Sequence, residues 1–285
     1  MESLRSLGDT TFRCYEAGDG AETVIFVHCS SGSYKEWRFA LADYQRKFHV
    51  LAPDLLGYGA NPTWPSPVNP YSVDDFALLL SLIPKDRPFH LVGHSYGAIL
   101  CLEIARRLAL QGQQPASLFL IEPPAAYALR NLSSHWSTFL KVSGKCRSAV
   151  AQGYFAKAAR AFMGYWIGHL GWLLTPRQQK SKIIASMGKV AYEFSLLYDN
   201  PTTFKDYAIL TCPTTLVSGS RSPRMVAAIN EGFLAHLRRA RHKLIKGAGH
   251  MCPYTHSAEV KELLDKHMGW VAKEMAGTNN VGAKI

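Results

Sequence analysis

The chain has 285 residues, of which 47% are hydrophobic and 19% are charged, and it carries a formal net charge of +11 at pH 7. This composition is enough to bury a large core, and one domain with an insertion fits the length better than two independent domains. No run approaches the roughly 20 apolar residues that a membrane-spanning helix requires, and the first residues lack the apolar stretch of a secretory signal, so we expect a cytoplasmic location.

The six cysteines do not form a metal-binding or redox pattern. They lie far apart, with no C-x-x-C pair and no histidine at the spacing of a zinc site. We therefore expect reduced thiols that act as small hydrophobic residues, with no metal and no other cofactor. No zinc finger or aromatic-studded RNA-binding strand occurs, so no nucleic-acid partner is expected.

Six apolar runs, separated by helical patterns, indicate βα units and an α/β fold with a mostly parallel sheet flanked by helices. The runs are residues 24–27, 50–52, 89–92, 118–121, 215–217 and 243–245. Polar or glycine-rich segments follow the runs, at the strand ends where an open α/β sheet binds its ligands. We expect the functional residues in these segments.

The third run leads into Gly93-His94-Ser95-Tyr96-Gly97, and a helix-forming stretch follows. At such a junction two glycines allow a strained turn that exposes a serine hydroxyl, so Ser95 is the predicted nucleophile. The same turn aims the Tyr96 N–H and the positive end of the helix at a forming oxyanion. The alternative is an ordinary Gly/Ser turn between a strand and a helix.

Further motifs join this pentapeptide in an order that resembles the α/β-hydrolase fold. They are the His28 loop, the Pro-Asp and Gly-Tyr-Gly segment at 53–59, and Gly249-His250 after the last run, and together they span most of residues 20–270. A narrower resemblance connects the chain to capped hydrolases of ill-defined substrate. The resemblance implies a fold and a reaction class, without a substrate.

The resemblance also implies roles for residues near the strand ends. His250 is the expected general base, because a serine is a poor nucleophile until an adjacent imidazole takes its proton. Ser30 is the expected second oxyanion donor beside Tyr96. The family's usual His-Gly pair is His28-Cys29 here, and Cys29 is expected to be a small wall residue of the pocket. His94 is expected to pack rather than to catalyse.

The acid of the triad departs from the family's commonest pattern. That pattern has an aspartate where this chain has Ser222, and a serine cannot hold a charge opposite an imidazolium. Glu122, at the end of the strand after the nucleophile's, is the predicted acid. The alternative is a buried or cap-anchoring glutamate. Asp199 and Asp206 are the other candidates.

Residues 126–209 are too many for a loop, and they predict a helical cap over the pocket. The hydrolase core would comprise residues 1–125 and 210–275, with 276–285 as a flexible tail. The cap is expected to line an apolar acyl or aryl site, although most of its apolar stripe would pack against the core. The predicted pocket residues are Cys29, Trp136, Tyr165, Trp166 and Met251.

Positive charge gathers in the same region. Residues 123–212 contain eleven Lys or Arg against three Asp or Glu, which is +8 of the chain's +11. Such a surface attracts anionic substrates or anionic membranes, although a solvated helix face is the simpler interpretation.

These residues predict an enzyme that hydrolyses small-molecule carboxylic esters through an acyl-enzyme intermediate. A serine at the elbow argues against epoxide hydrolase or dehalogenase chemistry, because those relatives place an aspartate there. Thioesterase, lactonase, amidase and acyltransferase activities remain alternatives. So does a non-catalytic ligand-binding member of the fold, and the oligomeric state is left open.

Overall fold

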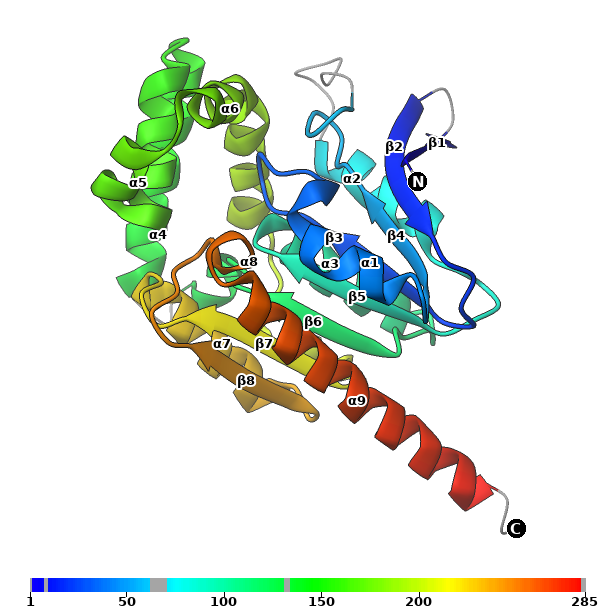
Figure 1. Cartoon of the computed structure of the whole chain (residues 1–285). Helices are drawn as coiled ribbons and strands as arrows, with labels where there is room; N and C mark the ends of the chain where they lie inside the picture. The colour runs from blue at the N-terminus through cyan, green and yellow to red at the C-terminus, as the bar shows by residue number, and fades with distance from the viewer. Residues whose placement is uncertain (1, 8–9, 62–70, 131–133, 283–285) are drawn as a thin grey trace.

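An open sheet forms the centre of the molecule (Figure 1). The computed structural model describes residues 2–7, 10–61, 71–130 and 134–282. In this part of the chain the sheet has eight strands, in the order β1-β2-β4-β3-β5-β6-β7-β8. The strands are β1 (Glu2–Leu7), β2 (Thr10–Ala17), β3 (Thr23–Val27), β4 (His49–Pro53), β5 (Phe89–His94), β6 (Ser117–Ile121), β7 (Thr214–Gly219) and β8 (Ala240–Ile245).

The strands from β3 to β8 pair in parallel, whereas β2 pairs antiparallel with both β1 and β4. Each of the six apolar runs lies within one of the strands β3 to β8. The prediction of a mostly parallel sheet is therefore confirmed. The hairpin of β1 and β2 leaves little trace in the sequence, because β1 is an edge strand whose side chains are alternately exposed and half-buried.

Helices cover both faces of this sheet. Those outside the β6–β7 connection are η1 (Tyr34–Trp37), α1 (Arg38–Tyr44), α2 (Tyr71–Leu82), α3 (Tyr96–Ala109), α7 (Arg224–His236), α8 (Cys252–Thr255) and α9 (Ser257–Gly282). Buried side chains of α2, α3 and α7 share one core with Ile25 and Leu91. Those of η1, α1 and α9 share another with Val24 and Val92. Neighbouring strand residues thus serve opposite faces, as the pleat requires.

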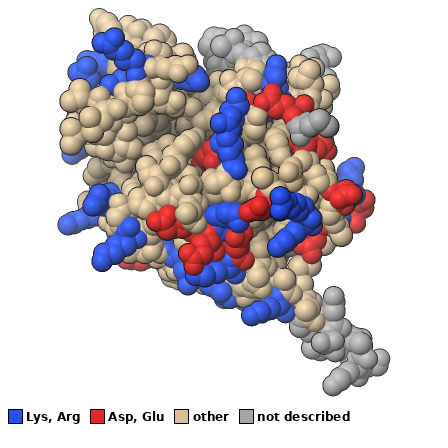
Figure 2. Space-filling model, viewed as in Figure 1, with Lys and Arg blue, Asp and Glu red and all other residues tan. Residues whose placement is uncertain are grey.

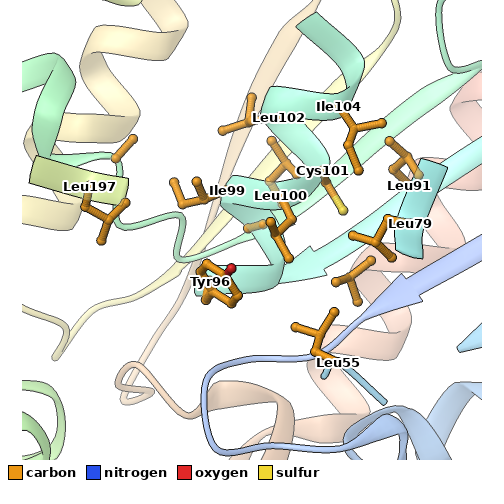
Figure 3. Packing of buried hydrophobic residues seen from close by; sticks show 14 of the residues in the cluster. Leu55, Leu79, Leu91, Tyr96, Ile99, Leu100, Cys101, Leu102, Ile104 and Leu197 are labelled. Carbon is orange, nitrogen blue, oxygen red and sulfur yellow. The ribbon is translucent and has the colours of Figure 1, made fainter. Parts of the chain in front are cut away.

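The larger core surrounds α3 (Figure 3). Leu79 of α2 and Leu91 of β5 lie with Leu100 and Ile104 of α3 in this cluster. Helix α3 starts at Tyr96, directly after the candidate nucleophile Ser95. The packing of α3 in this core therefore holds the start of the helix, next to Ser95, in place. Leu197, from the connection described next, belongs to the same cluster.

The connection from β6 to β7 is mainly helical. Its helices are η2 (Ala126–Leu129), α4 (Ser134–Ala151), α5 (Phe155–Leu174), α6 (Arg177–Asp199) and η3 (Phe204–Ile209). Helices α4, α5 and α6 contact one another and lie together on one side of the molecule (Figure 1). Helix α5 is kinked at Gly168, which has φ 75° and ψ 163°. We refer to α4, α5 and α6 as the insertion.

None of the described helices is both long enough and apolar enough to cross a lipid bilayer. Helix α9 projects away from the sheet at its end (Figure 1) and continues to Gly282. Residues 276–282, which the sequence predicts to be a flexible tail, are thus helical, because each residue added to an existing helix gains a hydrogen bond. Residues 283–285 lie outside the described part.

Candidate active site

Ser95 stands at a sharp turn between β5 and α3. Its backbone has φ 53° and ψ −120°, which a residue with a side chain rarely adopts. The flanking glycines allow the turn. A Cβ on Gly93 would lie 2.6 Å from the Gly97 carbonyl oxygen, and one on Gly97 would lie 2.3 Å from the Val27 carbonyl oxygen. The turn therefore presents the serine at the carboxyl end of β5.

A chain of two hydrogen bonds runs from Ser95 through His250 to Glu122, which come from two other strand ends. His250 Nε2 lies 3.0 Å from Ser95 Oγ, and His250 Nδ1 lies 3.2 Å from Glu122 Oε2. Glu122 directly follows β6, and His250 comes five residues after the end of β8. All three residues are buried. A hydroxyl thus faces an imidazole whose other nitrogen faces a carboxylate, which is the geometry that a Ser-His-acid triad needs.

Ser222 stands where the sequence pattern leads one to expect an aspartate, and it contacts Glu122. Glu122 Oε1 accepts hydrogen bonds from the Ser222 hydroxyl at 2.6 Å and from the Gly219 N–H at 2.7 Å. Burial alone would raise the pKa of Glu122. Hydrogen bonds from His250, Ser222 and Gly219 outweigh burial, so this pKa lies below its ordinary value. The end of β7 thus supplies donors to a carboxylate that comes from β6.

The imidazole of His250 is covered by Trp166 of α5. The two ring centroids lie 3.8 Å apart, with 22° between the ring planes. Burial lowers the pKa of His250, and the hydrogen bond to Glu122 opposes this only in part. The ring is therefore neutral at pH 7 and can accept a proton from Ser95.

Ser30 and Tyr96, the expected oxyanion donors, lie beside Ser95. All three line one cavity of about 20 Å³. Tyr96 is the first residue of α3, where backbone N–H groups have no partner inside the helix. The Ser30 hydroxyl donates to Glu193 Oε2 at 2.5 Å, and Ser31 Oγ lies 2.5 Å from Ser186 Oγ. Helix α6 therefore holds the loop that carries Ser30.

A second cavity, of about 40 Å³, also reaches Ser95. Of the predicted pocket residues, Cys29, Trp166 and Met251 line it. Burial raises the pKa of the Cys29 thiol well above its ordinary value, so this cysteine is a protonated wall residue. The insertion contributes Phe162, Met163, Trp166, Gln179 and Ile183 to the same cavity.

The structure places the other two predicted pocket residues elsewhere. Trp136 stacks on Phe139, with ring centroids 5.6 Å apart. In the described structure it lies outside the two cavities that Ser95 lines. Tyr165 lines a neighbouring groove of about 610 Å³, together with Trp166 and His250. Among the described residues that line the two cavities at Ser95, Trp166 belongs to both and Tyr165 to neither.

The alternative acids have other surroundings. Asp206 Oδ2 accepts hydrogen bonds from the Thr203 N–H and hydroxyl, both at 2.7 Å, and caps η3. Asp199 is exposed at the end of α6 and lines a groove with Arg106. The geometry therefore favours Glu122 as the partner of His250.

A buried polar network behind the pocket escaped the sequence analysis. Lys189 Nζ, from α6, lies 2.8 Å from Asp75 Oδ2 of α2. Glu193, one turn further along α6, accepts a hydrogen bond from the Tyr58 hydroxyl at 2.6 Å as well as the one from Ser30. Burial raises the pKa of Glu193 to about 7. The i, i+4 spacing of Lys189 and Glu193 was visible, but such spacing is also typical of solvated helix faces.

One group among the described residues has the donor types and spacing of a metal site. The ligand atoms of Cys29, Glu36 and His94 all lie within 4.8 Å of one another. Hydrogen bonds already occupy this group, because Glu36 bonds to His94 Nδ1 through Oε1 and accepts the Cys29 N–H through Oε2. Both oxygens of the Glu36 carboxylate and Nδ1 of His94 are therefore engaged within the protein.

The basic residues of the insertion are visible in Figure 2. The lobe that corresponds to α4, α5 and α6 in Figure 1 shows Lys and Arg side chains, whereas the acidic side chains of this face lie mostly elsewhere. Glu193, one of the three acids between residues 123 and 212, is buried. The positive excess of this segment is therefore carried by its surface.

Comparison with known proteins identifies the fold's family. The model of a family described as the alpha/beta hydrolase family matches residues 24–263, which run from β3 into α9. The chain belongs to the alpha/beta hydrolase family. The matched segment contains the sheet from β3 onward, the insertion and every residue of the candidate site.

Individual relatives are distant. The chain is 29% identical over 133 residues to Probable lysophospholipase BODYGUARD 4 of Arabidopsis thaliana, and 31% identical over 110 residues to Lipase LipV of Mycobacterium tuberculosis. These matches cover 41% and 38% of this chain but only 28% and 39% of those proteins. A match to Epoxide hydrolase 3 of Mus musculus is 24% identical over 277 residues and covers 87% of this chain and 71% of that protein.

Solved structures agree on the fold. MenH from S. aureus has a TM-score of 0.68 at 16% identity, covering 92% of this chain and 98% of MenH. Carboxylesterase CesB from Bacillus subtilis also has a TM-score of 0.68, at 17% identity, covering 94% of this chain and 91% of CesB. The protein is an alpha/beta hydrolase by family and fold, and its reaction must be argued from its own site.

Proposed function

We propose that the protein hydrolyses carboxylic esters, with Ser95 as nucleophile, His250 as general base and Glu122 as the acid. The observation that carries this proposal is the unbroken hydrogen-bonded chain from Ser95 Oγ, through both nitrogens of His250, to the Glu122 carboxylate. A serine in a strained turn with a neutral imidazole beside it has the nucleophile and the base that acyl transfer requires. The printed names of LipV and BODYGUARD 4 describe a lipase and a lysophospholipase, which agrees with an ester substrate.

In the first half of the proposed reaction, His250 takes the proton of Ser95 as the serine oxygen attacks the ester carbonyl carbon. The carbonyl electron pair moves to oxygen, and the N–H groups of Ser30 and Tyr96 stabilise the resulting oxyanion. The intermediate then collapses, the bond to the alcohol oxygen breaks, and His250 protonates the departing alcohol. Ser95 now carries the acyl group.

In the second half, His250 takes a proton from water, whose oxygen attacks the acyl carbon. The bond to Ser95 breaks, the serine recovers its proton from His250, and the carboxylic acid leaves. Throughout both halves, Glu122 keeps the Nδ1 proton of His250 in place and stabilises the imidazolium.

The two cavities that Ser95 lines favour a short acyl chain. Their volumes are about 40 and 20 Å³, and the smaller is walled by Phe139, Phe162 and Phe194. A cavity of that size holds little more than one water-sized group. We therefore propose a short apolar acyl group, with anionic esters weakly favoured by the basic surface of the insertion.

A fluorophosphonate probe tests the nucleophile. The wild-type protein should be labelled and Ser95→Ala should not, because the probe forms a bond with an activated serine oxygen. Ser181→Ala, which removes an exposed serine of α6, is the matched control and should be labelled like the wild type. A folded wild-type protein that resists labelling would contradict the proposal and favour a ligand-binding role.

A substrate panel then tests the ester class. Short-chain nitrophenyl esters should be turned over faster than matched thioesters, lactones and amides. Higher kcat/KM for a thioester or a lactone of the same acyl length would retain the triad and overturn the ester assignment.

A further inference from the structure

A second histidine and a second carboxylate lie beneath the candidate triad. His94 precedes Ser95 at the end of β5, and its Nδ1 lies 2.5 Å from Glu36 Oε1. Its Nε2 lies 2.9 Å from the carbonyl oxygen of His250. Both side chains of the pair are fully buried. The mechanism above assigns neither of them a step.

The partners of His94 determine its protonation. A carbonyl oxygen can only accept, so Nε2 must donate to His250. The bond to Glu36 therefore joins a carboxylate to an N–H, or a carboxylic acid to a bare nitrogen. Glu36 Oε2 accepts the Cys29 N–H at 3.0 Å, which stabilises the carboxylate form. These bonds favour a doubly protonated, positively charged His94 beside a negatively charged Glu36.

The pKa directions agree with this assignment. Burial would lower the pKa of His94, but Glu36 outweighs burial and raises this pKa above its ordinary value. Burial would raise the pKa of Glu36, but His94 outweighs burial and lowers it. The other titratable groups around the pair are His28, Cys29, Glu122, His250, Cys252 and Tyr254.

We propose that Glu36 and His94 form a permanently charged pair that positions the nucleophile, the oxyanion loop and the base for the reaction proposed above. The pair connects to three groups of the candidate site. His94 is adjacent to Ser95, the Cys29 N–H is adjacent to Ser30, and the His250 carbonyl belongs to the base itself. The pair therefore ties three separate strand ends together. The positioning role rests on the proposed function only where it predicts an effect on the reaction rate.

The charge also acts on the base. The rings of His94 and His250 have centroids 5.1 Å apart. A positive charge at that distance lowers the pKa of His250 and helps to keep the resting base neutral, although the negative charge of Glu36 opposes this effect. His94 is a positioning residue here, because neither of its nitrogens is available to take the Ser95 proton.

Kinetics of His94→Gln test the role. The amide can still donate to the His250 carbonyl, but it carries no charge and no imidazole for Glu36. We expect kcat to fall by about 10- to 100-fold with little change in KM, because the reacting groups are misplaced rather than lost. Removing the positive charge should also move the acid limb of kcat/KM to higher pH, by at least about half a pH unit.

The same strand offers a matched control. His90 of β5 is also buried, and its Nε2 lies 2.8 Å from Glu22 Oε2. His90→Gln removes a part-buried bond between a buried histidine and a carboxylate, four residues away from His94 and outside the site. It should leave kcat and the acid limb unchanged. Equal losses in both variants would reduce the pair to a structural role and overturn the proposal.

Nitrogen NMR of wild-type protein labelled with ¹⁵N-histidine tests the charge without any substrate. Both ring nitrogens of His94, assigned by their loss in His94→Gln, should show protonated shifts from pH 6 to 9. A bare Nδ1 at pH 7 would overturn the charged pair, whatever the enzyme hydrolyses. Failure of the fluorophosphonate labelling with both nitrogens protonated would instead overturn the proposed function alone.

Discussion

Ser95 and Glu122 reach the candidate site from strand ends, whereas Trp166 reaches it from helix α5 of the insertion. The two strand-end residues have φ of 53° and 51°, and each backbone N–H donates to a neighbouring strand or strand end, Ser95 to Ile121 and Glu122 to Val217, both at 2.9 Å. Trp166 is held by side-chain packing, through its stack on His250 and its contact with Tyr165. Backbone geometry thus fixes one half of the site, and packing fixes the other.

This difference predicts different kinds of loss. Changes to the strand-end half should remove the reaction, since its groups touch the reacting atoms. Changes to the insertion half should alter substrate choice and the environment of the base. Tyr96 and Lys189, which both bind Asp75 Oδ2 at 3.0 and 2.8 Å, connect the two halves.

The largest effect after loss of the nucleophile is expected from the acid. Glu122→Gln should lower kcat by roughly 10³- to 10⁴-fold, because the amide no longer holds the imidazole in the right tautomer or stabilises its cation. Turnover of a short nitrophenyl ester measures it. Asp206→Asn, which removes the acid that caps η3, should keep wild-type turnover. Wild-type turnover in Glu122→Gln would refute the assignment.

Ser222 allows a sharper version of this experiment. Its hydroxyl lies 2.6 Å from Glu122 Oε1, so a carboxylate introduced there places a negative charge close to the one that Glu122→Gln removes. The double variant Glu122→Gln with Ser222→Asp should have a kcat at least about tenfold higher than that of Glu122→Gln alone. No recovery in a folded double variant would mean that the β7 end cannot present an acid to His250 in this chain.

The next largest effect is expected from breaking the ion pair that connects the two halves. Lys189→Met leaves Asp75 buried without its ion pair, and we expect a loss of about 3–5 kcal/mol in the free energy of unfolding. Urea denaturation measures it. Lys182→Met, on the exposed side of the same helix, should change stability by less than about 0.5 kcal/mol. If both variants unfold at the same urea concentration, the buried bond does not stabilise the insertion.

The same division explains what the sequence could reveal. The buried parallel strands were predictable because they are continuous apolar runs, and the strand-end positions of Ser95 and Glu122 were predictable because each lies within three residues of the end of such a run. The residues of the insertion that line the cavities were harder to predict. Trp136 and Trp166 both lie in helical segments of the insertion, and the packing of α4 and α5 determines which one lines a cavity with Ser95.

Buried polar partners were harder still. Glu36 lies in a short segment between Ser33 and Trp37, where nothing local distinguishes it from an exposed glutamate. Its bonds to Cys29 and His94 span 7 and 58 residues of sequence. Burial and pairing of such groups depend on tertiary contacts, so a single sequence does not encode them in any local pattern.

A moderate effect is expected from replacing Trp166, whose ring covers His250. Trp166→Leu enlarges the space beside Ser95, so kcat/KM for longer acyl esters should rise about tenfold relative to the shortest. Trp136→Leu is the matched control, since this tryptophan also lies in the insertion but stacks on Phe139 outside the cavity. A chain-length panel measures the preference. An equal shift in both variants would show that general loosening, rather than the wall itself, sets acyl length.

The smallest effect concerns the base. Only neutral His250 can deprotonate Ser95, and burial lowers its pKa below 6.5, so kcat/KM should hold down to about pH 6.5 and fall below it. Trp166→Leu admits water to the ring, which relieves burial and should move this limb upward by less than about one pH unit. Glu193, with a pKa of about 7, titrates nearby, so both profiles are best recorded with Glu193→Gln. An unmoved limb would mean that the strand-end half alone sets the basicity of His250, and that the insertion contributes selectivity without tuning the chemistry.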